Sequence, residues 1–373
     1  MAQKHIEFDI TIIGAGVVGL SIAKTLAEQG KLSVLVIEKN ESFGQETSSR
    51  NSEVIHSGIF NHIDSIKYQF CVKGEKLLYN FCDQNKVWVN QCGKMIVSGK
   101  HEQNNFENFV HTLEEKEFNF DILNSQQTQK LEPSILSDQS ILINNSGIVD
   151  SHGLMNQLYR ISSNHHTYIF GSTPVEITKE NEQYHLTIQR KHQEIEHIRS
   201  RVVINAAGLQ SYKIAHHIMG EALQIPTMQF YKGSYFSLSP QWTNKFNRLI
   251  YSLPSDNDSL GVHVGFDSTG KSKLGPDYEH VEDDAWDYSV DVQSKKKFYA
   301  LAKNYIKDLD ITNLHPDYAG VRPKLFYSSN QFSDFYIQEE SENGYPNLIN
   351  LIGIDSPGLT SCLSIGEYVY KFV

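Results

Sequence analysis

The chain has 373 residues, of which 39% are hydrophobic and 21% are charged, and these values are typical of a soluble globular protein with a substantial core and exclude a disordered chain. The formal net charge of −11 argues against nucleic acid as the main partner. We see no signal peptide and no apolar run of about 18 residues, so we expect no transmembrane segment. The expected location is the cytoplasm, with peripheral attachment to the inner face of a membrane as an open alternative.

Cysteines and histidines give no sign of a metal site. The four cysteines, which are Cys71, Cys82, Cys92 and Cys362, form no CxxC pair and no zinc spacing. The sixteen histidines contain no HExxH or similar ligand pattern. We therefore predict that the thiols are free and that the protein holds no metal.

The first predicted element is an apolar strand at 10–13 that runs directly into a glycine-rich turn and a helix. The turn carries Gly14, Gly16 and Gly19 in the pattern GxGxxG. In a dinucleotide-binding fold the first glycine makes the tight turn and the second lets the backbone approach a pyrophosphate. The third allows the helix to pack closely on the strand, and the helix N-terminus holds negative charge.

A second strand at 34–37 follows the helix and ends at Glu38. This acid lies roughly 20 residues beyond the last glycine, where a carboxylate can bind the hydroxyl groups of a ribose. A glycine-rich turn alone would be weak evidence. Because the two strands, the helix and the acid all agree with it, we predict a site for FAD or NAD.

The remaining elements alternate between helical and extended patterns. Hydrophobic periodicity and turn residues distinguish them. A polar loop is expected over 40–51, and helices over 63–85, 104–117 and 294–307. Hairpins are expected over 88–97 and 175–188, an antiparallel sheet over 228–266, buried strands at 202–208 and 348–353, and a closing helix after 356–360.

These elements predict an α/β (α+β) fold in which a Rossmann-like cofactor domain is assembled from discontinuous pieces. The strand at 202–208 ends in small residues and returns to the first domain. The cofactor domain then comprises 1–85, 145–225 and 340–373. A second domain with an antiparallel sheet, which would hold the substrate, comprises 86–144 and 226–339.

Several segments across nearly the whole chain resemble the D-amino-acid-oxidase-like superfamily of FAD-dependent oxidoreductases. They are the segments at 48–59, 205–208, 318–323 and 353–360. Within that superfamily the chain looks most like the L-2-hydroxyglutarate dehydrogenases and oxidases. The segments that carry this closer resemblance are Asn51 to Ile59, Lys67 with Phe70 and Cys71, Cys92 to Met95, Ser146 to Val149, and Gly261 to His263.

Two positions depart from the pattern of that family. Glu53 replaces a glycine that often follows Asn-Ser, and Lys232 begins a Lys-Gly-Ser-Tyr-Phe segment where the family tends to have Arg-Gly-Glu-Tyr-Phe. These departures affect the substrate more than the cofactor.

The resemblance and the glycine pattern together imply FAD, since the segment at 353–360 would have no ligand to serve in a plain NAD enzyme. Ser48 and Ser49 offer hydroxyl groups to the pyrophosphate, although they would also suit a capped helix start. The helix after Pro357 would direct its positive end to the N1–C2=O edge of the flavin. The expected cofactor-binding residues are Gly14, Gly16, Val17, Val18, Gly19, Glu38, Lys39, Ser48, Ser49, Asn51, Val175, Ala207, Gly208, Gly353, Pro357, Gly358, Leu359 and Thr360.

The implied reaction is oxidation of an alcohol next to a carboxylate, with a hydride passing to flavin N5 and a base taking the hydroxyl proton. His56 is the first candidate for the base, and His263 is the second, because an imidazole titrates near neutral pH. Each could instead be a buried structural histidine. Arg322 is the candidate that would hold the carboxylate with two parallel hydrogen bonds, with a surface salt bridge as the alternative.

A dicarboxylate substrate would need a second cation. Lys67 and Lys232 are the candidates, although exposed lysines are more common, and Tyr235 and Tyr251 are candidates for lining the pocket.

Two other functions stay open at this point. A protein of the same fold could oxidise an amine such as glycine, sarcosine or another amino acid, and this reaction depends less on a base. A flavin-binding protein could also lack catalysis and act as a regulator or partner subunit. Oxygen, a quinone and another flavoprotein stay open as the acceptor that reoxidises the flavin.

Overall fold

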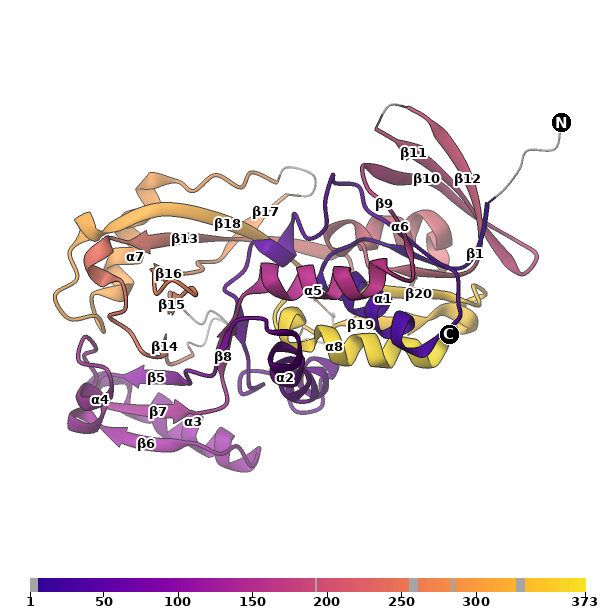
Figure 1. Cartoon of the computed structure of the whole chain (residues 1–373). Coiled ribbons are helices and arrows are strands. Elements are labelled where there is room, and N and C mark those ends of the chain that lie inside the picture. Colours follow the sequence, from indigo (N-terminus) through magenta and orange to yellow (C-terminus); the bar gives the residue numbers. More distant parts are fainter. Residues whose placement is uncertain (1–5, 192, 255–260, 283–285, 327–332) are drawn as a thin grey trace.

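Two large β-sheets organise the computed structural model, which describes residues 6–191, 193–254, 261–282, 286–326 and 333–373. The first sheet lies near both chain ends, and the second lies toward the opposite end of the molecule (Figure 1). Segments from distant parts of the sequence contribute to each sheet. This arrangement confirms the predicted mixed α/β fold.

The first sheet has eight strands and is built around the N-terminal strand. Its strands are β1 (Ile6–Ile13), β2 (Val34–Ile37), β9 (Thr167–Ile169), β10 (Ser172–Glu180), β11 (Gln183–Arg190), β12 (Ile195–Asn205), β19 (Tyr336–Glu339) and β20 (Leu348–Ile352). β1 lies in parallel between β2 and β12, while β9 extends the parallel sheet beyond β2. β12 also pairs in parallel with β20 and antiparallel with β11.

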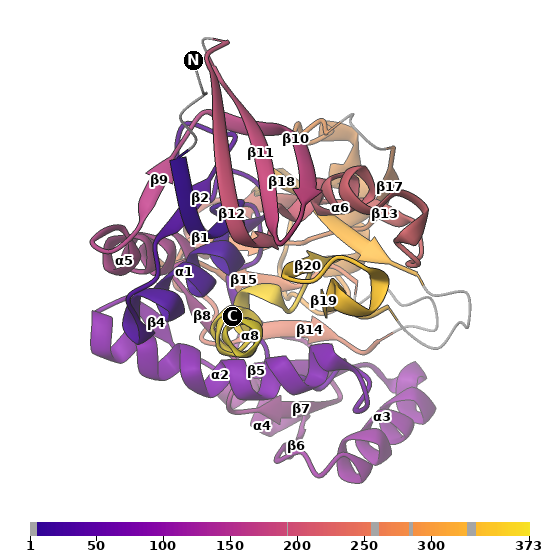
Figure 2. The ribbon, with the colours of Figure 1, turned by 90° about the vertical axis from the view of Figure 1, so that its right-hand side faces the viewer.

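Helices cover one face of this sheet, as Figure 2 shows from the end of the molecule. They are α1 (Val17–Gln29), α5 (Ser151–Ser163) and α8 (Gly358–Val369), and α2 (Ile66–Asn85) packs against α8. Ile10 and Ile12 are buried in the core that these helices share. Leu35 belongs to a second core on the opposite face, together with Ile177 of β10 and Met219 of α6 (Ser211–Met219). Burial on both faces explains why the parallel strands read as continuous apolar runs.

The second sheet has nine strands, most of them antiparallel. Its strands are β5 (Lys94–Ser98), β6 (Asp121–Asn124), β7 (Gln139–Ile143), β13 (Met228–Leu238), β14 (Leu249–Ser252), β15 (Val264–Phe266), β16 (Ser272–Leu274), β17 (Glu279–Val281) and β18 (Leu314–Leu325). β13 and β18 pair along most of their length, and β14 joins β5 in parallel. The helices α3 (Gln103–Glu115), α4 (Ser125–Leu131) and α7 (Lys295–Ala302) accompany this sheet.

The predicted hairpin at 88–97 is wrong. β4 (Val89–Asn90) pairs with β8 (Gly147–Val149), which also pairs with β3 (Val54–Ile55), so these three strands form a small separate sheet. β5 instead joins the second sheet. Gly93 lies between β4 and β5 with φ at 78°, a value that favours glycine, and there the chain passes from one sheet to the other rather than folding back on itself.

Other predicted bounds differ from the observed ones at element ends. The helix predicted over 294–307 ends at Ala302, and the polar loop over 40–51 contains a short 3-10 turn at Thr47–Ser49. Residues 255–260, within the antiparallel sheet predicted over 228–266, lie outside the described part of the chain. The predicted domain boundaries stay a prediction, and β19 belongs to the first sheet although it falls within 226–339.

No helix within the described ranges combines the length and the apolar character that a membrane span requires.

Candidate active site

A cavity of about 520 Å³ opens at the carboxyl ends of the parallel strands and continues toward the second sheet. The chain enters its lining directly after β1, β2 and β12, at Gly14, Glu38 and Ala206. This crevice is where open α/β sheets bind their ligands. β13 and β18 supply residues to the other end of the lining, so the cavity joins the two sheets.

The turn after β1 has the geometry that the glycine pattern predicts. Gly14 has φ at 103°, in the left-handed region that favours glycine. A Cβ on Gly19 would lie 2.0 Å from the carbonyl oxygen of Gly14, so any larger residue would push the helix away from the turn. A Cβ on Gly16 would meet only the Ser48 hydroxyl, at 3.0 Å, which leaves the backbone at this position open to a ligand.

Glu38 is fixed at the end of β2 by the backbone of the same turn. Its carboxylate accepts hydrogen bonds from the backbone nitrogens of Ala15 and Asn40, both at 2.9 Å. The side chain is only 7% exposed and lines the cavity. A buried carboxylate beside an open helix N-terminus fits the ribose and pyrophosphate of a dinucleotide.

The loop after β2 lies over this turn. Ser48 accepts a hydrogen bond from the backbone nitrogen of Val17 at 3.0 Å and thereby caps α1 from outside the helix. Ser49 donates instead to the Glu46 carbonyl, at 3.3 Å, and lies outside the cavity lining. Lys39 lines the cavity, and its ammonium pairs with the Glu46 carboxylate at 2.6 Å.

The start of α8 forms the far side of the same cavity. Pro357, Gly358 and Leu359 line it, so the positive end of the helix dipole lies at the cavity wall. Thr360 lies behind them and joins α8 to β3, because its hydroxyl accepts from the His56 backbone nitrogen at 3.0 Å and donates to the Val54 carbonyl at 3.3 Å.

Most of the expected cofactor residues meet in the cavity lining. Those that line it are Gly14, Gly16, Val17, Val18, Glu38, Lys39, Ser48, Asn51, Val175, Ala207, Gly208, Pro357, Gly358 and Leu359. Gly19, Ser49, Gly353 and Thr360 do not line it. Gly19 and Thr360 instead hold the surrounding elements together.

The end of the cavity toward the second sheet brings both candidate histidines together with Arg322. The imidazole of His263 stacks on the Tyr251 ring, with centroids 3.6 Å apart and planes 10° apart. His56 Nε2 lies 3.2 Å from the Ser356 hydroxyl. Burial, followed by the positive charges of Lys94 and Arg322, lowers the pKa of both histidines well below the usual value.

Tyr235 lies next to Arg322 in this part of the cavity. Its hydroxyl is 2.7 Å from the Ser52 hydroxyl, and its ring stacks on Tyr318 with centroids 4.4 Å apart. Burial raises the pKa of Tyr235, while Arg322 and Ser52 oppose that rise. The phenol is therefore neutral at physiological pH and can donate a hydrogen bond.

The two lysines expected to hold a second carboxylate do not line the cavity. Lys67 is buried and its ammonium pairs with the Asp355 carboxylate at 2.7 Å, and it is Asp355 that reaches the lining. Lys232 lies 3.7 Å from the Asp287 carboxylate. Each ammonium is thus engaged by an acid of the chain.

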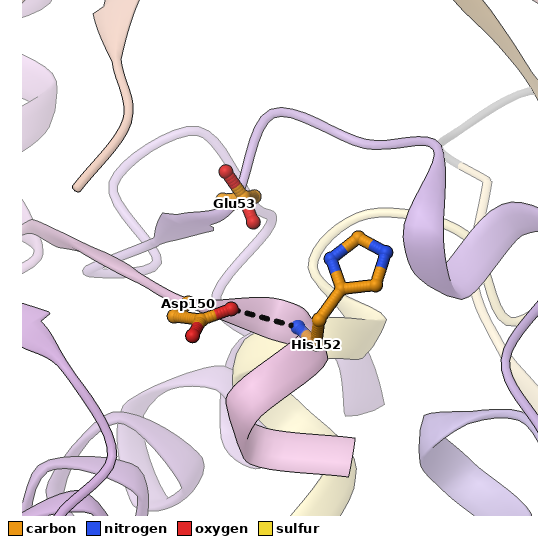
Figure 3. A group of neighbouring side chains, drawn as sticks. All are labelled: Glu53, Asp150 and His152. Atoms are coloured by element: carbon orange, nitrogen blue, oxygen red, sulfur yellow. Dashed lines mark hydrogen bonds between the residues drawn. The ribbon is translucent and has the colours of Figure 1, made fainter. Parts of the chain in front are cut away.

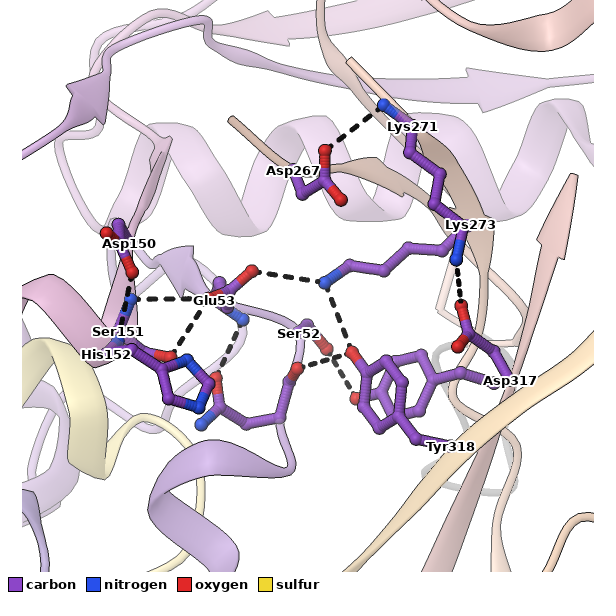
Figure 4. Close-up of polar contacts among 12 residues, drawn as sticks. Ser52, Glu53, Asp150, Ser151, His152, Asp267, Lys271, Lys273, Asp317 and Tyr318 are labelled. Atoms are coloured by element: carbon purple, nitrogen blue, oxygen red, sulfur yellow. Dashed lines mark hydrogen bonds and ion pairs between the residues drawn. The ribbon is translucent and has the colours of Figure 1, made fainter. Parts of the chain in front are cut away.

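Sequence reasoning gave no role to Lys94 or to the contacts of Glu53. Lys94 has no exposed surface and lies behind the Tyr251 ring. Glu53 lines the cavity, accepts from the Ser151 hydroxyl at 2.9 Å and pairs with Lys273 at 3.4 Å (Figure 4). A lysine at the start of the apolar run Met95 to Val97 was the signal that could have identified Lys94.

Glu53, Asp150 and His152 form a group whose ligand atoms lie within 4.8 Å of one another (Figure 3). Other contacts already use both carboxylates. Asp150 caps α5 by accepting from the backbone nitrogen of His152 at 3.1 Å, and Glu53 pairs with Lys273. A neighbouring ammonium opposes a metal cation, so we assign no metal to this group, and the predicted absence of a metal stays a prediction.

One end of the cavity therefore fits a dinucleotide, and the other collects titratable side chains around the start of α8, which is the layout of a flavin-dependent oxidoreductase. The chain belongs to the family of FAD-dependent oxidoreductases, whose sequence pattern matches residues 9–371. FAD as the cofactor and the predicted superfamily are thereby confirmed.

Individual relatives agree with this assignment. The chain is 34% identical to a mitochondrial L-2-hydroxyglutarate dehydrogenase of Arabidopsis thaliana, over 97% of this chain and 82% of the relative. Its structure superposes on L-alpha-glycerophosphate oxidase from Mycoplasma pneumoniae with FAD bound, with a TM-score of 0.86, 23% identity and coverage of 98% and 94%. It superposes on glycine oxidase from Geobacillus kaustophilus with a TM-score of 0.81 and 15% identity, over 99% of this chain and 95% of that structure. These two structural likenesses support the fold alone.

Proposed function

We propose that this protein oxidises a 2-hydroxy acid to the 2-oxo acid, with L-2-hydroxyglutarate as its substrate. The observation that carries the proposal is the meeting of His56, His263 and Arg322 at one end of the FAD cavity. The similarity to L-2-hydroxyglutarate dehydrogenases over nearly the whole chain supports the choice of acid.

The residues of the cavity fit the three demands of this reaction. Arg322 has a planar guanidinium that can hold the carboxylate next to the reacting carbon with two parallel hydrogen bonds. A neutral imidazole can accept the hydroxyl proton, and Tyr235 can donate a hydrogen bond to an anionic substrate. FAD, when bound, supplies the acceptor for the hydride.

The surroundings of the His263 ring support a role as proton acceptor rather than a purely structural role. Its Nδ1 is buried and has no hydrogen-bond partner among the described residues. A histidine with a purely structural role is normally held by hydrogen bonds at its buried ring nitrogens, and Nδ1 makes no such bond within the described ranges. A lowered pKa keeps the ring neutral and therefore able to take a proton at physiological pH.

Anaerobic mixing of the purified holoenzyme with a panel of donors tests the proposal. We expect L-2-hydroxyglutarate to bleach the flavin absorption faster than its D-enantiomer, L-lactate, glycerol 3-phosphate, glycine and sarcosine. Fastest bleaching by glycine or sarcosine would establish the amine-oxidase alternative. A yellow protein that no donor bleaches would support a flavin-binding protein without catalysis.

Gly16→Val tests the position of the cofactor. A branched side chain at this position would fill the space through which the backbone approaches the pyrophosphate, so we expect the purified variant to be colourless. Gly99→Val is the matched control, since Gly99 has extended backbone with φ at −94° and lies outside the cavity lining. The control should retain FAD, and full flavin content in Gly16→Val would contradict the assigned site.

A further inference from the structure

Lys94 is a buried cation that no described acid neutralises. Its side chain has no exposed surface, and its Nζ has no hydrogen-bond partner among the described residues. Cys71 and Cys92 are the groups whose thiolates would oppose its charge, but burial raises the pKa of these thiols to about 12 and about 11. Both are therefore neutral at physiological pH, and the positive charge of Lys94 stays uncompensated.

Two aromatic rings lie next to this ammonium, and one of them, Tyr251, lines the cavity. Nζ lies 4.4 Å from the centre of the Tyr251 ring and 5.2 Å from that of Phe60. Because His263 covers one face of Tyr251 at 3.6 Å, the ammonium approaches the other face. Lys94, Tyr251 and His263 therefore follow one another from the protein interior to the cavity, and only the last two line it.

Cation–π contacts of this kind are favourable, but they do not replace the hydration that a buried ammonium gives up. A buried charge without a partner lowers the stability of the folded state. A lysine kept in this position is therefore better explained by an effect on the cavity than by an effect on stability.

We propose that Lys94 is a positioning residue for the oxidation: its ammonium holds the Tyr251–His263 stack in place and puts a positive charge behind it that opposes protonation of the histidines in the cavity. This inference rests on the proposed function, because it requires an imidazole to act as the base.

Several charged and titratable groups face the histidines, and Lys94 must be weighed against them. Four groups from different elements face His263. They are Lys94 at the start of β5, Tyr251 on β14, His56 after β3 and Arg322 on β18. Burial lowers the pKa of both histidines most, and Lys94 comes before Arg322 among the charges that lower it further. Arg322 holds the substrate anion in the proposed reaction, which neutralises its influence when substrate is bound, whereas Lys94 keeps its charge.

Removal of this charge should shift the pKa of the base in a defined direction. Without Lys94 a protonated imidazole is less disfavoured, so the pKa of the base rises and the base becomes protonated at a higher pH. The acid limb of the profile of flavin reduction against pH should therefore move upward. Burial lowers the pKa of Lys94 itself to about 8, so the comparison is made below pH 7.5, where its ammonium is present.

The experiment compares Lys94→Met, Lys94→Gln and Lys303→Met with the wild-type holoenzyme, by anaerobic stopped-flow reduction from pH 5 to 7.5. Lys303 is the matched control because its ammonium also lies over a tyrosine ring, 5.6 Å from Tyr299, but outside the cavity lining. We expect both Lys94 variants to retain FAD and to shift the acid limb upward by about 0.5–1 pH unit. Reduction on that limb then falls roughly 3- to 10-fold, while Lys303→Met keeps the wild-type profile.

The two proposals fail in different ways. An unshifted acid limb in a folded Lys94 variant would overturn the role of Lys94, even if the rate on the plateau were lower. Failure of both Lys94 variants to fold would also overturn it, because a lysine that stability requires has a structural role. If the substitutions of His56 and His263 both leave reduction unchanged, the proposed base is wrong, and that result does not depend on Lys94.

Discussion

Replacing the histidine proposed as the base with glutamine should slow anaerobic reduction of the flavin by roughly 10²- to 10⁴-fold, the usual range for loss of a general base. His56→Gln and His263→Gln are both required, because each imidazole lines the cavity and each is held neutral by burial and nearby positive charge. Stopped-flow reduction by L-2-hydroxyglutarate measures the rate. FAD content measured on the same samples separates loss of catalysis from loss of cofactor.

His111→Gln is the control for this pair, because His111 is exposed on α3, lies outside the cavity lining and pairs with the exposed Glu115 at 3.3 Å. It should reduce at the wild-type rate. The variant that removes the base should also lose the acid limb of its pH profile, because the imidazole whose protonation produces that limb is then absent. Wild-type reduction rates in both His56→Gln and His263→Gln would show that these histidines do not remove the proton, and the amine-oxidase alternative would gain.

The cofactor end of the cavity was predictable from sequence because its geometry is local. Gly14, Gly16, Gly19 and Glu38 lie within one strand–turn–helix–strand unit, and the physical demand on each can be stated without the rest of the chain. The same holds for the start of α8, where Pro357 caps the helix and Gly358 begins it. The structure of such motifs can therefore be predicted from neighbouring residues alone.

Lysine partners were not predictable, because they come from distant parts of the chain. Lys67 meets Asp355, which lies 288 residues further along, and this contact turns an expected substrate ligand into part of a buried ion pair. Lys94 starts a strand whose residues are all buried, although the default expectation for a lysine is an exposed side chain. Only the packing of β5 against β14 shows that it lies behind Tyr251.

The hairpin predicted over 88–97 was wrong for a related reason. Alternating residues and a glycine near the centre are typical of a hairpin, and nothing local distinguishes a turn from a crossing between two sheets. The partners decide, because β8 takes β4 while β14 and β7 take β5. The two extended segments were predicted correctly, but their strand partners lie far away in the sequence and could not be inferred from the local pattern.

The second large effect is expected at Arg322. Its replacement by alanine should weaken transition-state binding of the hydroxy acid by about 2–5 kcal/mol, because it leaves the substrate carboxylate without its charged partner in a buried site. This corresponds to a loss of roughly 30- to 5,000-fold in kcat/KM. Arg322→Lys should not restore wild-type activity, since an ammonium cannot reproduce the planar two-pronged geometry of a guanidinium.

Steady-state kinetics with L-2-hydroxyglutarate, together with the Kd of a non-reacting dicarboxylate, checks this prediction. Arg160→Lys serves as the control, because Arg160 is exposed on α5, lies outside the cavity lining and donates to the Gln157 side chain at 2.8 Å. It should match the wild type in both measurements. Wild-type kinetics in Arg322→Lys on every acid that bleaches the flavin would show that Arg322 is not the carboxylate ligand. The anion would then have to be held by other polar groups of the lining, among which Tyr235, Ser52 and the two histidines are candidates.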